Sequence, residues 1–208
     1  MPSLSDLVTF GIASLALLVI PGPAVIYILN RSVADGRNTA LAGVAGLEIG
    51  NFVHVVAATL GLSAIIAASA TAFATVKWAG ALYLIFVGVR TLIATPTPPD
   101  ARSTSATARK AFTQGIVVNT LNPKVALFFL SFLPQFIDPN RGSPALQSFV
   151  LGSVFVILGC CSDAAYAITA SALRDRLLAG STLPFVQRYV AGSVFVTLGL
   201  IASTARRS

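Results

Sequence analysis

The chain has 208 residues, of which 55% are hydrophobic and only 10% are charged, and its formal net charge is +7. A soluble domain carries roughly 25% charged residues, so this composition excludes an ordinary soluble fold. The basic residues are spread over the connections between apolar segments and are not gathered on one face with interleaved aromatic residues, which argues against a nucleic-acid partner. The composition therefore predicts a chain embedded in a lipid bilayer.

Six apolar segments are long enough to cross a bilayer, whose hydrocarbon core of about 30 Å needs about 20 residues of helix. They lie near residues 6–30, 39–68, 71–94, 112–137, 144–173 and 183–203. Their polarity does not alternate as it does in the strands of a membrane barrel. No Lys or Arg precedes the first segment and no small-residue cleavage site follows it, so we expect a retained span and not a signal peptide. We predict an all-α membrane protein with six transmembrane helices.

Basic residues are concentrated in the connections after the first, third and fifth segments, for example at Arg31, Arg37, Arg109 and Lys110. Because cytoplasmic loops are enriched in Lys and Arg, this asymmetry predicts a multi-pass protein with both termini outside.

The two halves of the chain resemble each other weakly, because Gly22-Pro23 in the first span and Asn122-Pro123 in the fourth occupy matching places. We predict one transporter domain over residues 1–208, with a first repeat near 1–94, a linker near 95–111 and a second repeat near 112–208. Three spans in each repeat give the copies opposite orientations in the membrane. Inverted repeats are typical of secondary transporters, which bind substrate at the repeat interface.

Prolines interrupt the first and fourth spans, at Pro21-Gly22-Pro23 and at Asn122-Pro123. A proline inside a helix removes a hydrogen bond and clashes with the preceding turn, so we predict that both helices break near the midplane. The freed backbone groups are tolerated in hydrocarbon only at a cavity or a buried contact. An ordinary kink packed against a neighbouring helix is the alternative.

Four ionisable side chains fall inside the predicted spans: Glu48, His54, Lys124 and Asp163. Such groups mark ion and substrate pathways. At 1.5 Å per residue, Glu48 and Asp163 lie about 16 Å from the basic ends of their spans, and the two breaks lie at about 14 and 18 Å. The acids and the breaks therefore converge on one layer. The positive N-termini of half-helices beyond the breaks suit a carboxylate, and the acids suit an ammonium, so we interpret the layer as a site for a zwitterion.

Several of these side chains have two possible roles. Lys124 either forms a structural ion pair with Asp163 or Glu48, or binds a substrate carboxylate directly. His54 either relays protons or is held by a structural hydrogen bond. Protonation of Glu48 or Asp163 would couple transport to a proton gradient. We expect close helix packing, and not ligand contact, at Gly43, Gly46 and Gly50.

Two further function classes have little support. A metal-ion exporter needs a cluster of ligands, and two carboxylates with one histidine are few. An intramembrane enzyme needs a nucleophile beside its base, and no serine lies at helical spacing from a base within one segment. We predict no enzymatic activity, no metal and no cofactor.

Blocks distributed over most of the chain, from about residue 10 to residue 199, resemble the LysE/RhtB family of amino-acid exporters. They are Pro21-Gly22-Pro23, Asp35-Gly36-Arg37, Gly46-Leu47-Glu48-Ile49-Gly50-Asn51-Phe52-Val53-His54, Lys77-Trp78-Ala79-Gly80, Asn119-Thr120-Leu121-Asn122-Pro123-Lys124 and Leu133-Pro134-Gln135-Phe136. The resemblance implies an inner (plasma) membrane protein that exports amino acids using the proton motive force. The sequence differs from the pattern of this family at Glu48, where many members have a neutral residue.

We therefore predict secondary active export of a neutral or cationic amino acid of the homoserine, threonine or lysine type, because two acids and one lysine suit such a cargo better than a dicarboxylate. Metal ions or other small metabolites are the alternative cargo. The predicted partners are the amino acid and the lipid bilayer, and a homo-oligomer is left open. We assign substrate binding or translocation to Pro21, Gly22, Pro23, Asn119, Asn122, Pro123 and Lys124.

Overall fold

The computed structural model describes residues 1–68 and 106–173, with isolated positions between Thr75 and Ile93, and this part of the chain is all-helical. The helices are α1 (Leu4–Val19), α2 (Pro23–Asp35), α3 (Arg37–Ala68), α5 (Ala108–Thr120), α6 (Pro123–Ser131) and α7 (Pro144–Ala172), with 3₁₀ helices η1 (Leu133–Phe136) and η2 (Pro139–Arg141). The predicted all-α class is confirmed. The predicted spans near 71–94 and 183–203 and most of the linker near 95–111 lie outside the described residues.

Two of these helices are long and apolar enough to cross a membrane alone, at Arg37–Gly61 and Pro144–Ala172. α1 and α2 form a pair bent by 51°, and α5 forms a second pair with Pro123–Phe136, bent by 43°. If each bent pair is one span, the described residues contain up to four spans. These four agree with the predicted segments near 6–30, 39–68, 112–137 and 144–173, and both predicted helix breaks are present.

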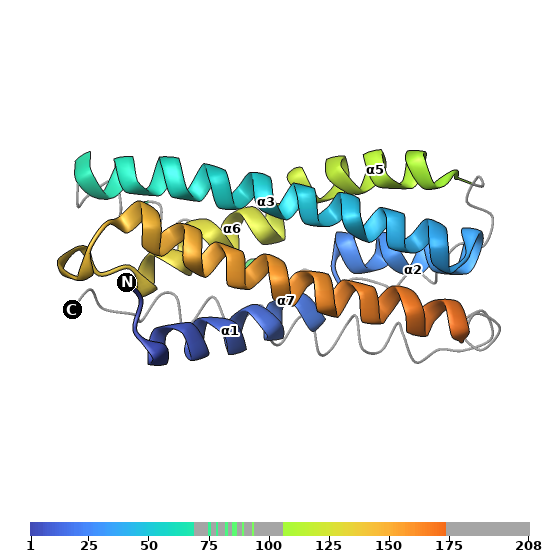
Figure 1. Cartoon of the computed structure of the whole chain (residues 1–208), viewed down its shortest axis with the longest axis horizontal. Helices are drawn as coiled ribbons and strands as arrows, with labels where there is room; N and C mark the ends of the chain where they lie inside the picture. The colour runs from blue at the N-terminus through green and yellow to red at the C-terminus, as the bar shows by residue number, and fades with distance from the viewer. Residues whose placement is uncertain are drawn as a thin grey trace.

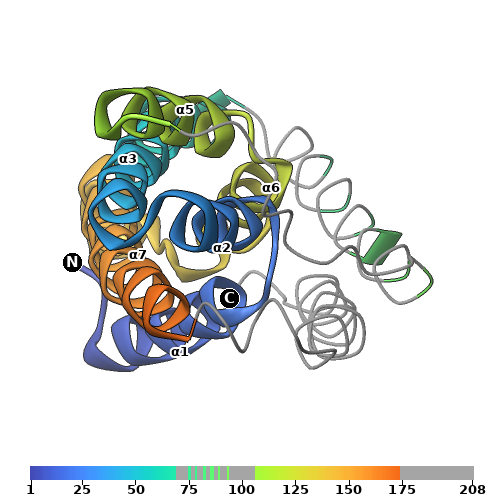
Figure 2. The same ribbon diagram turned by 90° about the vertical axis from the view of Figure 1, so that its right-hand side faces the viewer.

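The two broken helices run in opposite directions through the bundle. In Figure 1, α1 and α2 lead from left to right, α3 returns, α5 and α6 lead from right to left, and α7 returns. Contacts at both ends agree with this course. The amino group of Met1 donates to the carbonyl of Arg141 at one end, and at the other the backbone N–H of Ala106 donates to Asp35 Oδ1 at 3.0 Å. α2 lies in the middle of the described bundle, beside α3 and α7 (Figure 2).

Both second half-helices begin in the same way. Pro23 and Pro123 occupy the first helical position, where the missing N–H removes no helical bond and the fixed φ suits a helix. Gly22 precedes α2 with extended backbone, and Asn122 precedes α6 and caps it, since its Oδ1 accepts from the N–H of Lys124 at 3.1 Å. Proline chemistry therefore sets the position of each break.

Apolar clusters lie on either side of the breaks. Toward the N-terminal end of α1, Phe10 packs on Phe128 with ring centroids 5.6 Å apart, and Phe128 packs on Phe155 at 5.4 Å. Toward the far end of α2, Ile28 packs with Leu47 and other buried side chains of α3 and α7. The polar groups at the breaks are thus confined to a layer between two apolar clusters.

Glycines bring α3 and α5 into very close contact. A Cβ atom added to Gly46 would lie 2.0 Å from the carbonyl oxygen of Phe112, and one added to Gly115 would lie 2.4 Å from that of Gly43. One added to Gly50 would lie 2.8 Å from Cβ of Asn119. Small residues allow this approach between membrane helices, so the predicted close packing is confirmed.

Replacing Gly46 by alanine is therefore expected to separate α3 from α5. Overpacking typically costs about 1–3 kcal/mol, and here the obstructing atom belongs to the backbone, which cannot turn aside. Gly61→Ala is the matched control on the same helix, because no atom of the described residues lies within 4 Å of its added Cβ. Thermal unfolding of the purified proteins in detergent should show a lowered Tm for Gly46→Ala alone. Equal Tm values for both variants would contradict the packing described here.

Candidate functional site

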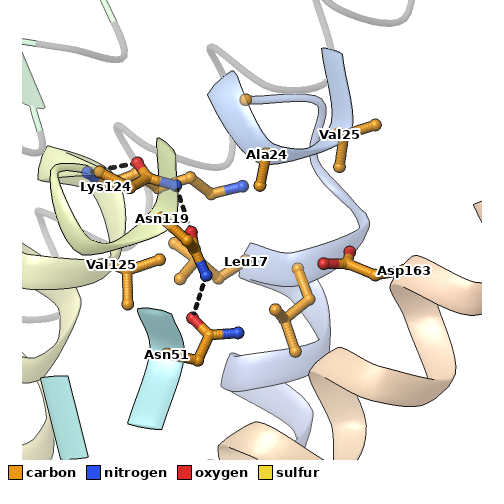
Figure 3. A pocket seen from close by; sticks show the side chains of 11 residues that line it. Leu17, Ala24, Val25, Asn51, Asn119, Lys124, Val125 and Asp163 are labelled. Carbon is orange, nitrogen blue, oxygen red and sulfur yellow. Dashed lines mark hydrogen bonds between the residues drawn. The ribbon is translucent and has the colours of Figure 1, made fainter. Parts of the chain in front are cut away.

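A small cavity lies where the two breaks meet (Figure 3). Its lining comes from every long helix of the described bundle and consists of Leu17, Leu18, Gly22, Ala24, Val25, Asn51, Asn119, Asn122, Lys124, Val125 and Asp163. We call it the central cavity. Its volume is about 20 Å³. Because one water molecule needs at least about 10–15 Å³, this space has room for roughly one water.

Two of the carbonyl groups released at the first break accept hydrogen bonds from side chains in distant parts of the chain. Lys124 Nζ donates to the carbonyl of Ile20 at 2.7 Å, and the hydroxyl of Tyr166 donates to that of Val19 at 2.5 Å. The carbonyl of Leu17 accepts from the N–H of Ile20 at 3.3 Å. The end of α1 is therefore held by α6 and α7.

Three asparagines connect the second break to α3. Asn122 Nδ2 donates to Asn119 Oδ1 at 3.0 Å, and Asn119 Nδ2 donates to Asn51 Oδ1 at 2.7 Å and to the carbonyl of Leu47 at 2.8 Å. All three side chains are buried. We call Asn51, Asn119 and Asn122 the asparagine chain. Because an amide both donates and accepts, the chain satisfies buried polar groups without introducing a charge.

Glu48 extends the asparagine chain toward α7. Asn51 Nδ2 donates to Glu48 Oε2 at 3.0 Å, whereas Glu48 Oε1 is buried without a hydrogen-bond partner in the described part of the chain. A Cβ on Gly159 would lie 3.0 Å from Oε2, so the glycine leaves room for the carboxyl group between α3 and α7. Glu48 is thus one hydrogen bond away from the central cavity.

His54 stabilises the end of α5. Its Nε2 lies 2.9 Å from the carbonyl of Asn119, and its ring stacks near Phe129 with centroids 6.4 Å apart. Since a carbonyl can only accept, Nε2 carries the hydrogen. The imidazole therefore contacts backbone at the second break, and its Nε2 bonds to no serine hydroxyl there.

Asp163 supplies the negative charge of the central cavity. Its side chain is only 2% exposed, and among residues 1–68 and 106–173 it forms neither a hydrogen bond nor an ion pair. Figure 3 shows Asp163 entering from α7 and Lys124 entering from α6, on opposite sides of the space. The two groups that the sequence offered as an ion pair thus face one cavity, with Lys124 Nζ bonded to the backbone of Ile20.

The structure brings together most of the residues singled out from the sequence. Those that line the central cavity are Gly22, Asn119, Asn122, Lys124 and Asp163, while Pro21, Pro23 and Pro123 form the breaks and Glu48 and His54 lie one hydrogen bond away. Sequence reasoning missed Asn51 and Tyr166. Asn51 lies three residues after Glu48 and Tyr166 three residues after Asp163, a spacing that places each on the same helix face as the acid.

A metal site is not apparent in the described ranges. No group of three His, Cys, Asp or Glu side chains close enough to hold an ion occurs among them.

Comparison with known protein families shows which family the chain belongs to. A sequence model described as LysE type translocator matches residues 15–205. The chain belongs to the LysE-type translocator family. The resemblance noted in the sequence is thereby confirmed, and since members of this family are transporters and not enzymes, the helices described above belong to a membrane exporter.

Three relatives of the chain cover most of its length. A leucine efflux protein of Klebsiella pneumoniae is 28% identical over 74% of this chain and 73% of its own. An uncharacterised membrane protein of Vibrio cholerae is 33% identical over 82% of this chain and 81% of its own. Another, of Pseudomonas aeruginosa, is 28% identical over 88% and 91%. No solved structure matches the chain.

The asparagine chain predicts a large effect of Asn119→Leu, which keeps the shape of the side chain and removes its polar atoms. The change leaves Asn51 Oδ1 and the carbonyl of Leu47 buried without their donor, at a cost of about 1–3 kcal/mol. We expect a clearly lowered Tm in detergent, whereas Asn140→Ala on the exposed helix η2 should leave it unchanged. An unchanged Tm for Asn119→Leu would refute the proposed role of the chain.

Proposed function

We propose that this protein is a secondary active exporter of amino acids in the cytoplasmic (plasma) membrane, driven by the proton motive force. One observation carries the proposal: both ends of the broken first helix, and the buried carboxyl group of Asp163 on α7, face a small cavity at the meeting point of the two halves. The family supports export, and the leucine efflux relative supports an amino-acid cargo.

The charges around the central cavity suit a zwitterion. No side chain among the described residues caps the N-terminus of α2, so the amides there are available to a substrate carboxylate. Asp163 and the carbonyl end of α1 supply negative charge for an ammonium. Lys124 balances Asp163, so a neutral amino acid enters without leaving an uncompensated charge.

The apolar part of the lining indicates the side chain of the cargo. Leu17, Leu18, Val25 and Val125 surround the polar groups. Within the neutral or cationic class expected from the sequence, this lining favours an amino acid with a neutral, largely aliphatic side chain, and the leucine efflux relative supports the same choice.

Transport requires the small cavity to widen and to open to one side at a time. A space of about 20 Å³ is too small for an amino acid, and apolar clusters lie on either side of it. Contacts between the halves lie toward both ends: Arg141 bonds Asp6 at 3.2 Å at one end, and the Tyr27 hydroxyl bonds the carbonyl of Ala111 at 2.6 Å toward the other. We infer that the halves rock against each other around the breaks, releasing these contacts in turn.

The proposed halves are inverted repeats, with both termini outside. The opposite courses of the two broken helices and the proline at the start of α2 and of α6 support this arrangement. The basic residues of the first and third connections support the orientation.

The first prediction is selective efflux. Cells that overproduce the protein and are fed a panel of dipeptides should release one or two amino acids, measured in the medium. An Asn122→Ala/Pro123→Ala variant removes the cap and the proline of α6 and should abolish that release at equal membrane abundance. If wild-type and variant cells release the same amino acids at the same rates, amino-acid export is refuted and ions or other metabolites become the better candidates.

The second prediction concerns proton coupling through Asp163 or Glu48. Asp163→Asn and Glu48→Gln keep the size of each group and remove its titration. In proteoliposomes we expect at least one of them to abolish the acceleration of flux by a pH gradient while downhill flux continues. Asp100→Asn, in the predicted linker near 95–111, is the control. Gradient-driven flux that is unchanged in both cavity variants would assign these acids a structural role.

A further inference from the structure

Lys124 reaches a backbone carbonyl at the first break with its long, flexible side chain. Its ammonium donates to the carbonyl of Ile20 at 2.7 Å. In an unbroken helix this carbonyl would accept the N–H of Ala24, which instead belongs to the first turn of α2. The carbonyls of Leu17 and Val19 are occupied by a backbone amide and by the phenol of Tyr166.

The same carbonyl lies where a bound amino acid needs a partner. A carboxylate at the N-terminus of α2 carries its ammonium on the adjacent carbon, so that ammonium reaches back across the break toward the end of α1. The C-terminal end of a helix is partly negative and suits a cation. In the empty protein, this position holds the ammonium of Lys124.

Asp163 provides a second place for the lysine ammonium. Its carboxyl group faces the same cavity, is buried, and has no hydrogen-bond partner among the described residues. A lysine displaced from Ile20 can therefore move to Asp163 without leaving the cavity. A buried charge with no partner is strongly unfavourable, so the lysine ammonium is stabilised at the carbonyl of Ile20 and at the carboxyl group of Asp163.

We propose that Lys124 is a tethered cation that occupies the ammonium subsite of the empty exporter and moves to Asp163 when an amino acid binds. This inference rests on the proposed function. With the lysine in place, the carbonyl of Ile20 is satisfied during the return of the empty protein. With an amino acid bound, the substrate ammonium satisfies it instead. The lysine is therefore needed for return of the empty protein, and much less for movement of the loaded one.

Gly22 is part of this arrangement. A Cβ atom there would lie 3.0 Å from Cδ and 3.4 Å from Nζ of Lys124. The backbone of Gly22 is extended, with φ of −132°, so alanine is allowed and its methyl group would press on the lysine side chain. Gly22→Ala thus weakens the lysine contact without removing the charge.

The test separates net efflux from exchange. Proteoliposomes are loaded with a mixture of ¹³C-labelled proteinogenic amino acids and placed either in buffer without amino acids or in the same unlabelled mixture, and released label is measured by mass spectrometry. For Lys124→Met we expect net efflux to fall at least about tenfold, the scale of one charge-assisted hydrogen bond, and exchange to fall less than about twofold. Lys124→Arg should retain more net efflux than Lys124→Met, and Lys110→Met, an exposed lysine of α5, should match wild type.

Each outcome decides between the alternatives. Equal loss of net efflux and exchange in folded Lys124→Met overturns the inference and makes the lysine a direct ligand of the substrate. If Lys124→Met does not fold, Gly22→Ala takes its place: a selective loss of net efflux supports the inference and an equal loss overturns it. Wild-type protein that moves no amino acid in either assay refutes the proposed function itself, whereas active wild type with an equal loss in the variants refutes the lysine role alone.

Discussion

Backbone groups that a proline releases inside a bilayer must find partners within the protein, because lipid offers none. This constraint organises the whole structure. The carbonyls of Val19 and Ile20 are released in the first half of the chain, and their donors, Tyr166 and Lys124, belong to the second half. The second break is joined in return to α3 of the first half through the asparagine chain. The sequence feature that interrupts each helix thus also ties the two halves together.

The same constraint explains why the polar groups occupy a thin layer. Apolar clusters that contain Phe128 on one side and Ile28 on the other flank the breaks. The space that remains holds about one water, so a larger occupant requires the halves to separate. In the proposed rocking motion, separation at one end would break the contact of Arg141 with Asp6, and separation at the other end would break that of Tyr27 with Ala111. A buried site of this size is therefore suited to alternating access.

Much of this was predictable from the sequence, because the decisive effects are local. Charge content predicted the membrane class, and the missing N–H of Pro21, Pro23 and Pro123 predicted both breaks. The partners of the broken ends were not predictable, since Tyr166 and Lys124 reach them only through the packing of α6 and α7 against α1. The role of Lys124 depended on the same tertiary placement. The sequence alone did not distinguish Asn51 from other polar residues in the spans, because its role depends on the hydrogen bond with Asn119.

Substrate protection of a cysteine inside the central cavity tests the account most directly. Cys160 and Cys161, which are exposed free thiols, are first replaced by alanine, and Ala24→Cys then places one thiol in the cavity lining. The rate of alkylation by a membrane-permeant maleimide is measured in active proteoliposomes with and without the amino-acid mixture, and Asn140→Cys on the exposed helix η2 is the control. If amino acids bind in the central cavity, they slow labelling at Ala24→Cys and leave labelling at Asn140→Cys unchanged. Equal labelling of Ala24→Cys with and without amino acids, in protein that still transports them, would contradict the account.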